Sequence, residues 1–409
     1  MEIHRESNLD DSTYFVEEVY SNKNNELELT IFDVEKYYHQ FDEDGFNQEI
    51  LSDNEIIHRF WKTIILPENQ FNFNPQSRFF DYRNGSFFNA NNRFLARHYR
   101  YIDWSSRSRF YISKPLKHIS PLKKECSSYH VNVGHGNCTF ITDGTTSIGV
   151  DCSAIDFRNH RSYHKNIVDC IDQIKNDFSL TKFRLNFFIL THPHYDHYSG
   201  IDFLCKKNVI DQDTTVYLNQ YYSHPNPLKI GAIQRLGSKA NNIIEPIKCN
   251  STSLINIIYP KLRCYKNGST VNVPHISQQN PNDSSTVVKI CSETRSMLIT
   301  GDIEKKGWKH IDVCNDINDI NYYIHSHHGS QNGFTINSCS IHSQATDISA
   351  CMSNCLQTII LGRTGAFSNM PCSAVTTAFP SALYSEADAK QAPAKFLKLE
   401  WDSNKPIWF

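Results

Sequence analysis

The segment from Thr191 to His197 holds the residues of this sequence that are best suited to chemistry. It reads Thr-His-Pro-His-Tyr-Asp-His, and its ligand-type side chains are those of His192, His194, Asp196 and His197. In an extended or tightly turned segment, His192 and His194 project to the same side and can bind one metal ion. After the turn, Asp196 and His197 are expected to face a neighbouring second ion. Imidazole and carboxylate ligands without a thiol suit zinc, manganese or iron(II).

A buried strand is expected to position this segment. The apolar run 185–190 predicts such a strand, and its C-terminal end leads directly into Thr191. A chance His-rich loop is the alternative interpretation. It would require four ligand-type residues at this spacing to coincide with a strand end and with the downstream motifs described below.

The region before this strand also alternates between predicted strands, turns and a helix. Strands are predicted at 129–133, 138–141 and 147–150, around turns at 134–137 and 143–144. Asp151 follows the end of the last of these strands, where side chains typically face a site. A helix is predicted over 164–176, because its apolar residues recur on one face.

These residues resemble a known family. His-x-His-x-Asp-His is the signature of the metallo-β-lactamase superfamily, whose fold is an αββα sandwich with the metal site at one edge. Further segments resemble, in order and approximate spacing, the soluble domain of the DNA-uptake protein ComEC and its stand-alone relatives. These segments are 133–141, 282–288, 298–302 and 323–330, within a match that runs from 126 to about 385. The implied fold class is an α/β (α+β) metallo-β-lactamase sandwich, preceded by a smaller mixed N-terminal domain.

The resemblance implies a role for each matching residue. His192 and His194 would bind the first metal, and Asp196 and His197 the second. Asp302 would bridge the two ions. His327 would complete the shell of the second metal, with His328 as the close competitor. The catalytic residues implied in this way are Asp196, Asp302, His327 and His328.

The sequence departs from the family pattern at two places. Asn282 and Asp283 stand where most of the superfamily supplies another histidine to the first metal, so this ion is either weakly held or bound by Asp283. Met370 stands where a Gly-His-Pro histidine is expected. The acid for the leaving group would then be His328, His325 or metal-bound water. Asp151 is expected to order the ligand loop from behind rather than to bind metal.

The implied cofactors are two divalent metal ions, zinc or manganese. Two ions about 3.5–4 Å apart can share a water and stabilise charge on the attacking and leaving oxygens. The leading hypothesis is therefore a phosphodiesterase or nuclease that cleaves DNA or RNA. One alternative is a small-molecule hydrolase acting on an ester, lactone, thioester or cyclic nucleotide. Another is a partner-binding regulatory protein with a vestigial metal site.

Length and composition predict two domains in an ordinary globular protein. A chain of 409 residues is longer than one hydrophobic core usually supports, and the composition changes near residue 120. We expect an N-terminal accessory domain of unknown role over 1–120 and the hydrolase domain over 121–409. The net charge of −2 excludes a whole-molecule attraction to nucleic acid, so the metals or a local patch would have to attract a polyanion.

Cysteine usage and hydropathy predict the compartment. The 13 cysteines are odd in number and widely spaced, and the sequence does not start with an apolar signal segment. We therefore expect the cysteines to be reduced thiols in a cytoplasmic protein. We also expect the protein to have no membrane span.

The N-terminal region gives weaker signals. Helices are predicted at 33–41 and 53–65. The aromatic and Arg-rich stretch 71–111 fits single-stranded nucleic-acid binding, a small core with amphipathic rims, or a protein–protein surface. A protein partner could therefore bind through residues 1–120.

Overall fold

The computed structural model divides the chain into two compact units. Unit 1 comprises Met1–Phe110, Ile155–Ser162 and Pro225–Gly231, and unit 2 comprises Tyr111–Ala154, Tyr163–His224 and Ala232–Phe409. The structure describes residues 4–5, 9–10, 12–21, 26–33, 61–67, 79–83, 86–89, 119–156, 161–218, 236, 239–240, 242–244, 252–259, 282–308, 311, 316–317, 319–335, 348–352, 354–362, 370–385 and 394–409.

The described part of unit 1 contains a six-stranded sheet in the order β1-β4-β3-β2-β5-β6. Its strands are β1 His4–Arg5, β2 Ser12–Ser21, β3 Glu26–Asp33, β4 Trp61–Pro67, β5 Phe79–Arg83 and β6 Ser86–Asn89. Leu27, Leu29 and Ile31 alternate along β3 and are buried, as expected of a strand with one face against a core. A short hairpin of β10 (Ile155–Asp156) and β11 (Arg161–Ser162) also belongs to this unit.

The structure bears on both helices that were predicted for this region. The predicted helix over 53–65 is wrong from Trp61 onward, because β4 begins there and pairs with β3. The β-branched run Thr63-Ile64-Ile65 favours a strand and outweighs the helical spacing of the apolar residues. Residues 53–60 and 34–41 lie outside the described residues, whereas Asp33 ends β3.

Two aromatic residues of the 71–111 stretch have described side chains. Phe80 and Tyr82 are both buried in the core of the unit 1 sheet. For these two residues the structure favours the core interpretation over an exposed stacking platform.

The first sheet of unit 2 has, among the described residues, eight strands in the order β14-β13-β12-β9-β8-β7-β21-β22. They are β7 Ser127–Val131, β8 Cys138–Thr142, β9 Ser147–Cys152, β12 Phe187–Leu190, β13 Thr215–Leu218, β14 Asn242–Ile244, β21 Phe396–Glu400 and β22 Lys405–Trp408. The predicted strands before residue 190 are confirmed within a few residues. Because β9 and β12 are parallel neighbours, their C-terminal ends meet at one edge of the sheet.

The second sheet of unit 2 has six described strands in the order β15-β16-β17-β18-β19-β20. They are β15 Ile255–Tyr259, β16 Val287–Cys291, β17 Ser296–Ile299, β18 Tyr322–Ile324, β19 Gln357–Ile360 and β20 Leu383–Tyr384. Strands β17, β18 and β19 run parallel, so the segments that follow them also gather at one edge. These segments carry Asp302 and the pair His327 and His328.

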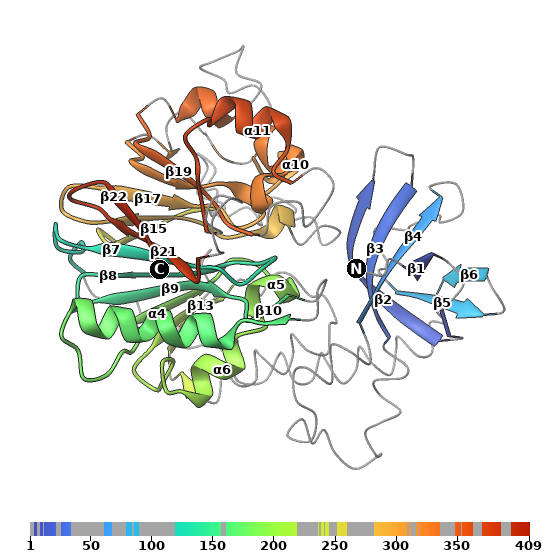
Figure 1. The fold of residues 1–409 in the computed structure, drawn as a ribbon, viewed down its shortest axis with the longest axis horizontal. Helices are drawn as coiled ribbons and strands as arrows, with labels where there is room; N and C mark the ends of the chain where they lie inside the picture. Colours follow the sequence, from blue (N-terminus) through green and yellow to red (C-terminus); the bar gives the residue numbers. More distant parts are fainter. Residues whose placement is uncertain are drawn as a thin grey trace, which may run out of the picture. The chain divides into compact units, whose positions relative to one another are not determined.

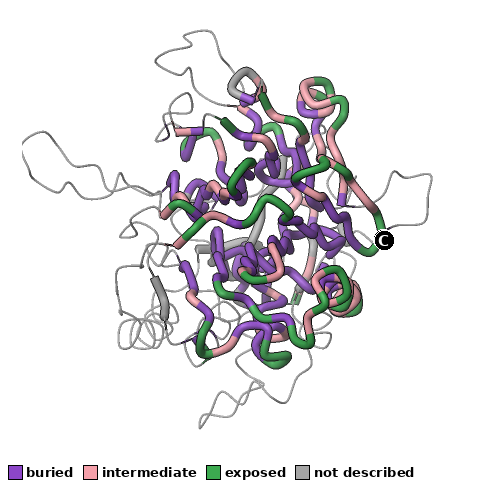
Figure 2. The backbone as a smooth tube through the Cα atoms, turned by 90° about the vertical axis from the view of Figure 1, so that its left-hand side faces the viewer, coloured by how far each residue is buried: buried purple, intermediate pink, exposed green. Residues whose placement is uncertain are grey.

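The two sheets of unit 2 pack face to face. One buried core joins Val150 and Ile189 of the first sheet to Ile299 and Ile324 of the second. A second core lies on the other face of the second sheet, beneath α8 (Lys305–Trp308), α10 (Gln331–Phe334) and α11 (Ser373–Ala378). In Figure 2 the buried segments run through the interior and the exposed ones follow the surface helices and turns.

Helix α4 (His164–Asp177) covers the outer face of the first sheet (Figure 1). Its buried residues Ile167, Cys170 and Ile174 face inward, and Tyr129 of β7 donates a hydrogen bond to Asp177 at 2.6 Å. This confirms the predicted helix and completes an αββα sandwich, the fold class expected from the sequence. Among the residues that the structure describes, none of the helices is both long and apolar enough to cross a membrane.

Candidate metal centre

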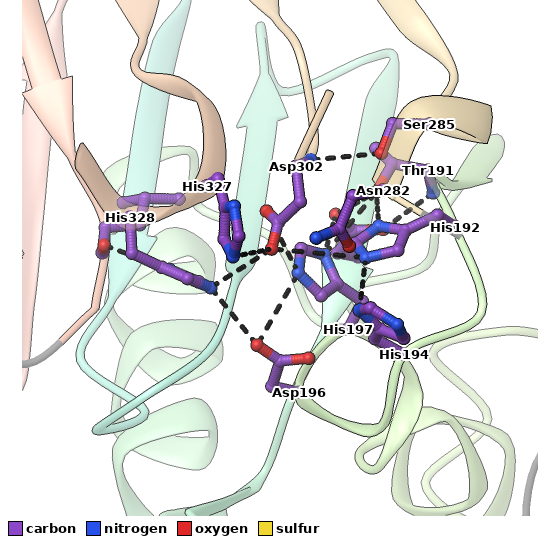
Figure 3. A network of polar contacts seen from close by, with 12 residues as sticks. Thr191, His192, His194, Asp196, His197, Asn282, Ser285, Asp302, His327 and His328 are labelled. Carbon is purple, nitrogen blue, oxygen red and sulfur yellow. Dashed lines mark hydrogen bonds and ion pairs between the residues drawn. The ribbon is translucent and has the colours of Figure 1, made fainter. Parts of the chain in front are cut away.

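The candidate centre lies where strand ends of both unit 2 sheets converge (Figure 3). The segment after β12 supplies Thr191 to His197, and the segments after β17 and β18 supply residues of the second sheet. A hydrogen bond joins the two sides directly, because Thr286 donates its backbone N–H to the Thr191 carbonyl at 2.7 Å. On the side of the second sheet, the backbone N–H of His327 donates to the Gly301 carbonyl at 3.2 Å. The loops that carry the predicted ligands therefore share one backbone framework.

Three imidazoles surround one carboxylate oxygen at this point. Oδ2 of Asp196 lies 3.1 Å from Nε2 of His328, 3.5 Å from Nε2 of His135 and 3.7 Å from Nε2 of His197. Asp302 adds a second carboxylate, with Oδ1 3.3 Å from His197 Nε2 and Oδ2 3.5 Å from His328 Nε2. Ligand atoms of Asp196, His197, Asp302 and His328 all lie within 4.8 Å of one another, and all four residues are buried.

A second pair of imidazoles lies on the other side of Asp302. His192 Nε2 is 3.0 Å from His194 Nδ1 and 4.0 Å from Asp302 Oδ2. Figure 3 shows Asp302 between this pair and the side chains of His327 and His328. The structure thus brings together the histidines and aspartates of the predicted motif and places Asp302 where it faces both groups.

The spacing of these atoms fits a metal centre. Donor atoms around one tetrahedral zinc ion lie about 3.3 Å apart, because each is about 2.0–2.1 Å from the ion. The separations around Asp196 Oδ2 and Asp302 match this value. Within the described residues, Asp196 Oδ1 and both oxygens of Asp302 are buried without a hydrogen-bond partner. Buried carboxylates of this kind need a cation, and divalent ions supply that charge.

The pKa values reflect the same concentration of charge. Burial favours the neutral acids, but His197 and His328 outweigh it and lower the pKa of Asp196 and of Asp302. Burial likewise opposes charge on His197, but Asp302, Asp196 and Asp151 outweigh it and raise its pKa. The two carboxylates are therefore held ionised, as metal ligands must be.

Asp151 holds His197 from behind the centre. Its Oδ2 is 2.7 Å from Nδ1 of His197 and accepts a hydrogen bond of 2.7 Å from the Thr191 hydroxyl, and its Oδ1 accepts the Thr191 backbone N–H at 2.8 Å. Because Nδ1 of His197 faces Asp151, its Nε2 is left to face Asp196 and Asp302. Asp151 reaches this position with a φ of 53°, a strained value for a residue with a side chain.

The structure distinguishes the two adjacent histidines of the loop after β18. His328 has Nδ1 3.2 Å from the Leu361 carbonyl, which directs Nε2 at Asp196. His327 faces Glu304 instead, with 3.1 Å between Nδ1 and Oε1, and its Nε2 is 4.0 Å from Asp302 Oδ2. Of the two candidates for the second metal, His328 is thus the closer to Asp196.

Asp283 is not part of the group around Asp196. Its Oδ1 accepts the backbone N–H of Gly307 at 2.8 Å, and burial, together with nearby Glu304, raises its pKa to about 6. Asn282 donates to Glu304 Oε1 at 3.0 Å and lies beside His192 in Figure 3. The role of Asp283 as a ligand of the first metal stays a prediction.

His325, another candidate proton donor, lies in different surroundings from His328. His325 packs against Tyr323, Phe334 and Phe379, and its Nδ1 is 2.8 Å from the Ser326 carbonyl. Met370 is buried and precedes a cis peptide bond to Pro371. His325 is therefore part of the core behind the centre.

Two residues of this region were not singled out from the sequence. His135 and Glu304 stand alone in their segments, so no local spacing marks them. Only the turn at 134–137 gave a signal for His135, as part of the expected opening strand pair.

No protein-family model and no curated protein matches the sequence. Solved structures that are similar in fold include the metallo-beta-lactamase fold protein YhfI from Bacillus subtilis, which is 12% identical. The match covers 64% of this chain and 95% of that one, with a TM-score of 0.35. Igni18, a metallo hydrolase from Ignicoccus hospitalis, is 9% identical over 67% of this chain and 99% of that one, with a TM-score of 0.33.

Similarity at this level assigns no activity. The strand order and layers of unit 2 are those of the αββα sandwich expected from the sequence, and the buried group of His and Asp could hold a metal ion.

Proposed function

We propose that this protein is a metal-dependent phosphodiesterase or nuclease that cleaves DNA or RNA with two zinc or manganese ions. The position of Asp302 carries the proposal. Its carboxylate lies between the pair His192 and His194 and the group around Asp196, within 4.0 Å of nitrogens on both sides. One carboxylate facing two donor groups suits a bridging ligand, and two adjacent ions suit in-line displacement at a phosphate.

Each side chain then has a distinct task. His192 and His194 would hold one ion, and Asp196, His197 and His328 the other. When bound, such ions activate water and neutralise charge on the phosphate oxygens. The chain itself fixes the ligands: Asp151 orients His197, and the Leu361 carbonyl orients His328.

We assign contact with the leaving-group oxygen to His327, whose Nε2 lies 4.0 Å from Asp302 Oδ2. Glu304 engages its Nδ1 at 3.1 Å, so its ring is held while Nε2 faces the centre. A role of residues 1–120 in choosing the substrate or binding a protein partner stays a prediction.

Cleavage assays on the full chain test the proposal. Single- and double-stranded DNA and RNA are incubated with added manganese or zinc, beside chromogenic esters. Asp302→Asn is expected to lower oligonucleotide cleavage at least about 100-fold, the effect of losing a group that stabilises transition-state charge. Asp172→Asn, which removes a half-exposed carboxylate paired with Lys175 on α4, is the control.

Two outcomes would contradict the proposal. Ester cleavage without oligonucleotide cleavage indicates a small-molecule hydrolase. Undiminished oligonucleotide cleavage by Asp302→Asn would show that the activity does not arise from this centre.

A further inference from the structure

The turn between β7 and β8 brings an additional histidine into the candidate centre. His135 lies at this turn, far from the Thr191 to His197 segment in sequence, and its side chain is fully buried. Its ring packs against that of His328, with 4.4 Å between the ring centroids, and its Nε2 is 3.5 Å from Asp196 Oδ2.

The turn is held tightly in the position that presents His135. Gly134 donates its backbone N–H to Oδ1 of Asn132 at 3.1 Å, and Asn132 in turn donates to the Ala394 carbonyl at 2.9 Å. On its other side, Asn137 donates its backbone N–H to the Asp196 carbonyl at 3.0 Å. Hydrogen bonds thus fix the backbone on both sides of His135. One of these bonds is to Asp196, the residue that His135 faces.

Gly136 allows this close approach. A Cβ at that position would lie 2.6 Å from the Asp196 carbonyl oxygen and 2.6 Å from Cβ of Ser153, and its φ is 148°. Only glycine fits such a contact without displacing backbone. The sequence Gly134-His135-Gly136 therefore serves to bring an imidazole against Asp196.

A buried histidine of purely structural type is present nearby for comparison. His130 of β7 has Nε2 3.0 Å from the Ser128 hydroxyl and Nδ1 3.2 Å from the Thr139 hydroxyl, so neutral groups of the neighbouring strands surround it. His135 instead faces the carboxylate of Asp196, and its ring packs against that of His328 at a tilted angle. Its distance to Asp196 Oδ2 falls between those of His328 and His197.

We propose that His135 is a further ligand of the metal ion held by Asp196 and His328. This inference rests on the proposed metal centre and adds a residue that the sequence motif does not contain. An additional imidazole enriches this side of the centre in nitrogen donors, which favours zinc over manganese. The loss of His135 should therefore weaken zinc binding more than manganese binding.

Metal titration of the full chain tests this proposal. Wild type, His135→Gln and the control His164→Gln are stripped of metal and titrated with zinc against a competing chelator. His164 packs against Phe203 with a ring-centroid distance of 4.6 Å and serves as a histidine outside the centre. We expect zinc affinity to fall at least about 10-fold in His135→Gln, with a smaller fall for manganese and no change in the control.

Cobalt-loaded protein separates a ligand from a residue that only supports one. Imidazole N–H protons of ligands to cobalt(II) are strongly shifted in the proton NMR spectrum. His135→Gln is expected to lose one such signal while the others remain. Weaker binding with all the wild-type signals retained would make His135 a positioning residue and overturn the proposal, as would unchanged zinc affinity.

Two further results are interpretable. If wild type itself binds no cobalt or zinc, the proposed metal centre fails, and the role of His135 fails with it. If His135→Gln does not fold by circular dichroism, wild type labelled with [15N]histidine and loaded with cadmium-113 gives the answer. Scalar coupling between cadmium and the His135 ring is then expected, and its absence would overturn the proposal.

Discussion

The imidazole of His328 reaches Asp196, with 3.1 Å between Nε2 and Oδ2. Its neighbour His327 turns instead to Glu304. Both histidines have positive φ, 50° and 51°, and this backbone sends two adjacent side chains to different partners. The relationship assigns them different roles and makes those roles separable by mutation.

Substitution of the two histidines should give different results. His328→Gln removes a donor that faces both carboxylates, so zinc affinity is expected to fall by more than about 100-fold. In His327→Gln the loss of zinc affinity should be smaller, because the ring of His327 contacts Glu304 rather than Asp196. Cleavage should still drop in this variant. Chelator competition and single-turnover cleavage measure the two effects. Equal losses of zinc affinity in the two variants would contradict the assignment.

Asp151→Asn should weaken the centre without removing a ligand. The Asn side chain has no negative charge and only one oxygen, so it cannot hold both the Thr191 hydroxyl and His197 as the carboxylate does. His197 is therefore less well oriented. We expect about a 10- to 100-fold loss of zinc affinity, as is typical for partners of metal-bound histidines. Asp177→Asn is the matched control, because it changes a carboxylate of α4 that accepts a hydrogen bond from Tyr129 of β7. A variant with wild-type affinity would remove Asp151 from the account.

Gly136→Ala tests the turn that carries His135. The added Cβ would meet the Asp196 carbonyl at 2.6 Å, and the positive φ adds strain. We expect a loss of zinc affinity and a lower thermal unfolding temperature, because either the turn or Asp196 must move. Differential scanning calorimetry with and without zinc measures both effects. Full retention of zinc binding and stability would show that the turn tolerates a side chain.

Asp143 gives a prediction about stability and pH away from the centre. Its Oδ1 accepts the backbone N–H groups of Thr145 at 2.8 Å and Thr146 at 2.7 Å, and its Oδ2 accepts that of Lys123 at 3.0 Å. Burial favours the neutral acid, but these hydrogen bonds outweigh it and lower the pKa of Asp143. The stabilisation is therefore complete above the unfolded-state pKa and is lost as the pH falls through the folded-state value.

Asp143→Asn is accordingly expected to lower the free energy of unfolding at pH 7 by about 1 kcal/mol. The difference from wild type should shrink in acid, where Asp143 itself becomes neutral. Urea unfolding at a series of pH values measures it. A difference that stays constant down to the acid limit would argue against the charged hydrogen bonds.

The sequence was most informative where chemistry and local structure coincide. His192 to His197 are contiguous and follow an apolar strand, so both the ligands and the strand could be predicted. Asp302 was assigned through the family resemblance of segment 298–302, and in the structure it follows the buried strand β17. The αββα sandwich of unit 2 was implied by the family resemblance, whereas the strands and the helix between 129 and 190 were predicted from their own period-2 and period-3.6 patterns.

The remaining features depend on contacts that have no local signal. His135 is joined to Asp196 by a long-range backbone hydrogen bond, from Asn137, that exists only in the folded chain. His327 and His328 could not be ranked, because positive φ values override simple alternation. In unit 1, Ile64 and Ile65 fit a helical period as well as a strand, and pairing with β3 decided in favour of the strand.

Elemental analysis of the purified full-length chain tests the central claim most directly. We expect about two zinc or manganese ions per chain, with a marked loss after Asp302→Asn. Removal of the ions with a chelator should lower the thermal unfolding temperature, because Asp196 and Asp302 are then buried without a cation. A carefully prepared wild-type protein that retains and rebinds no metal would contradict the account.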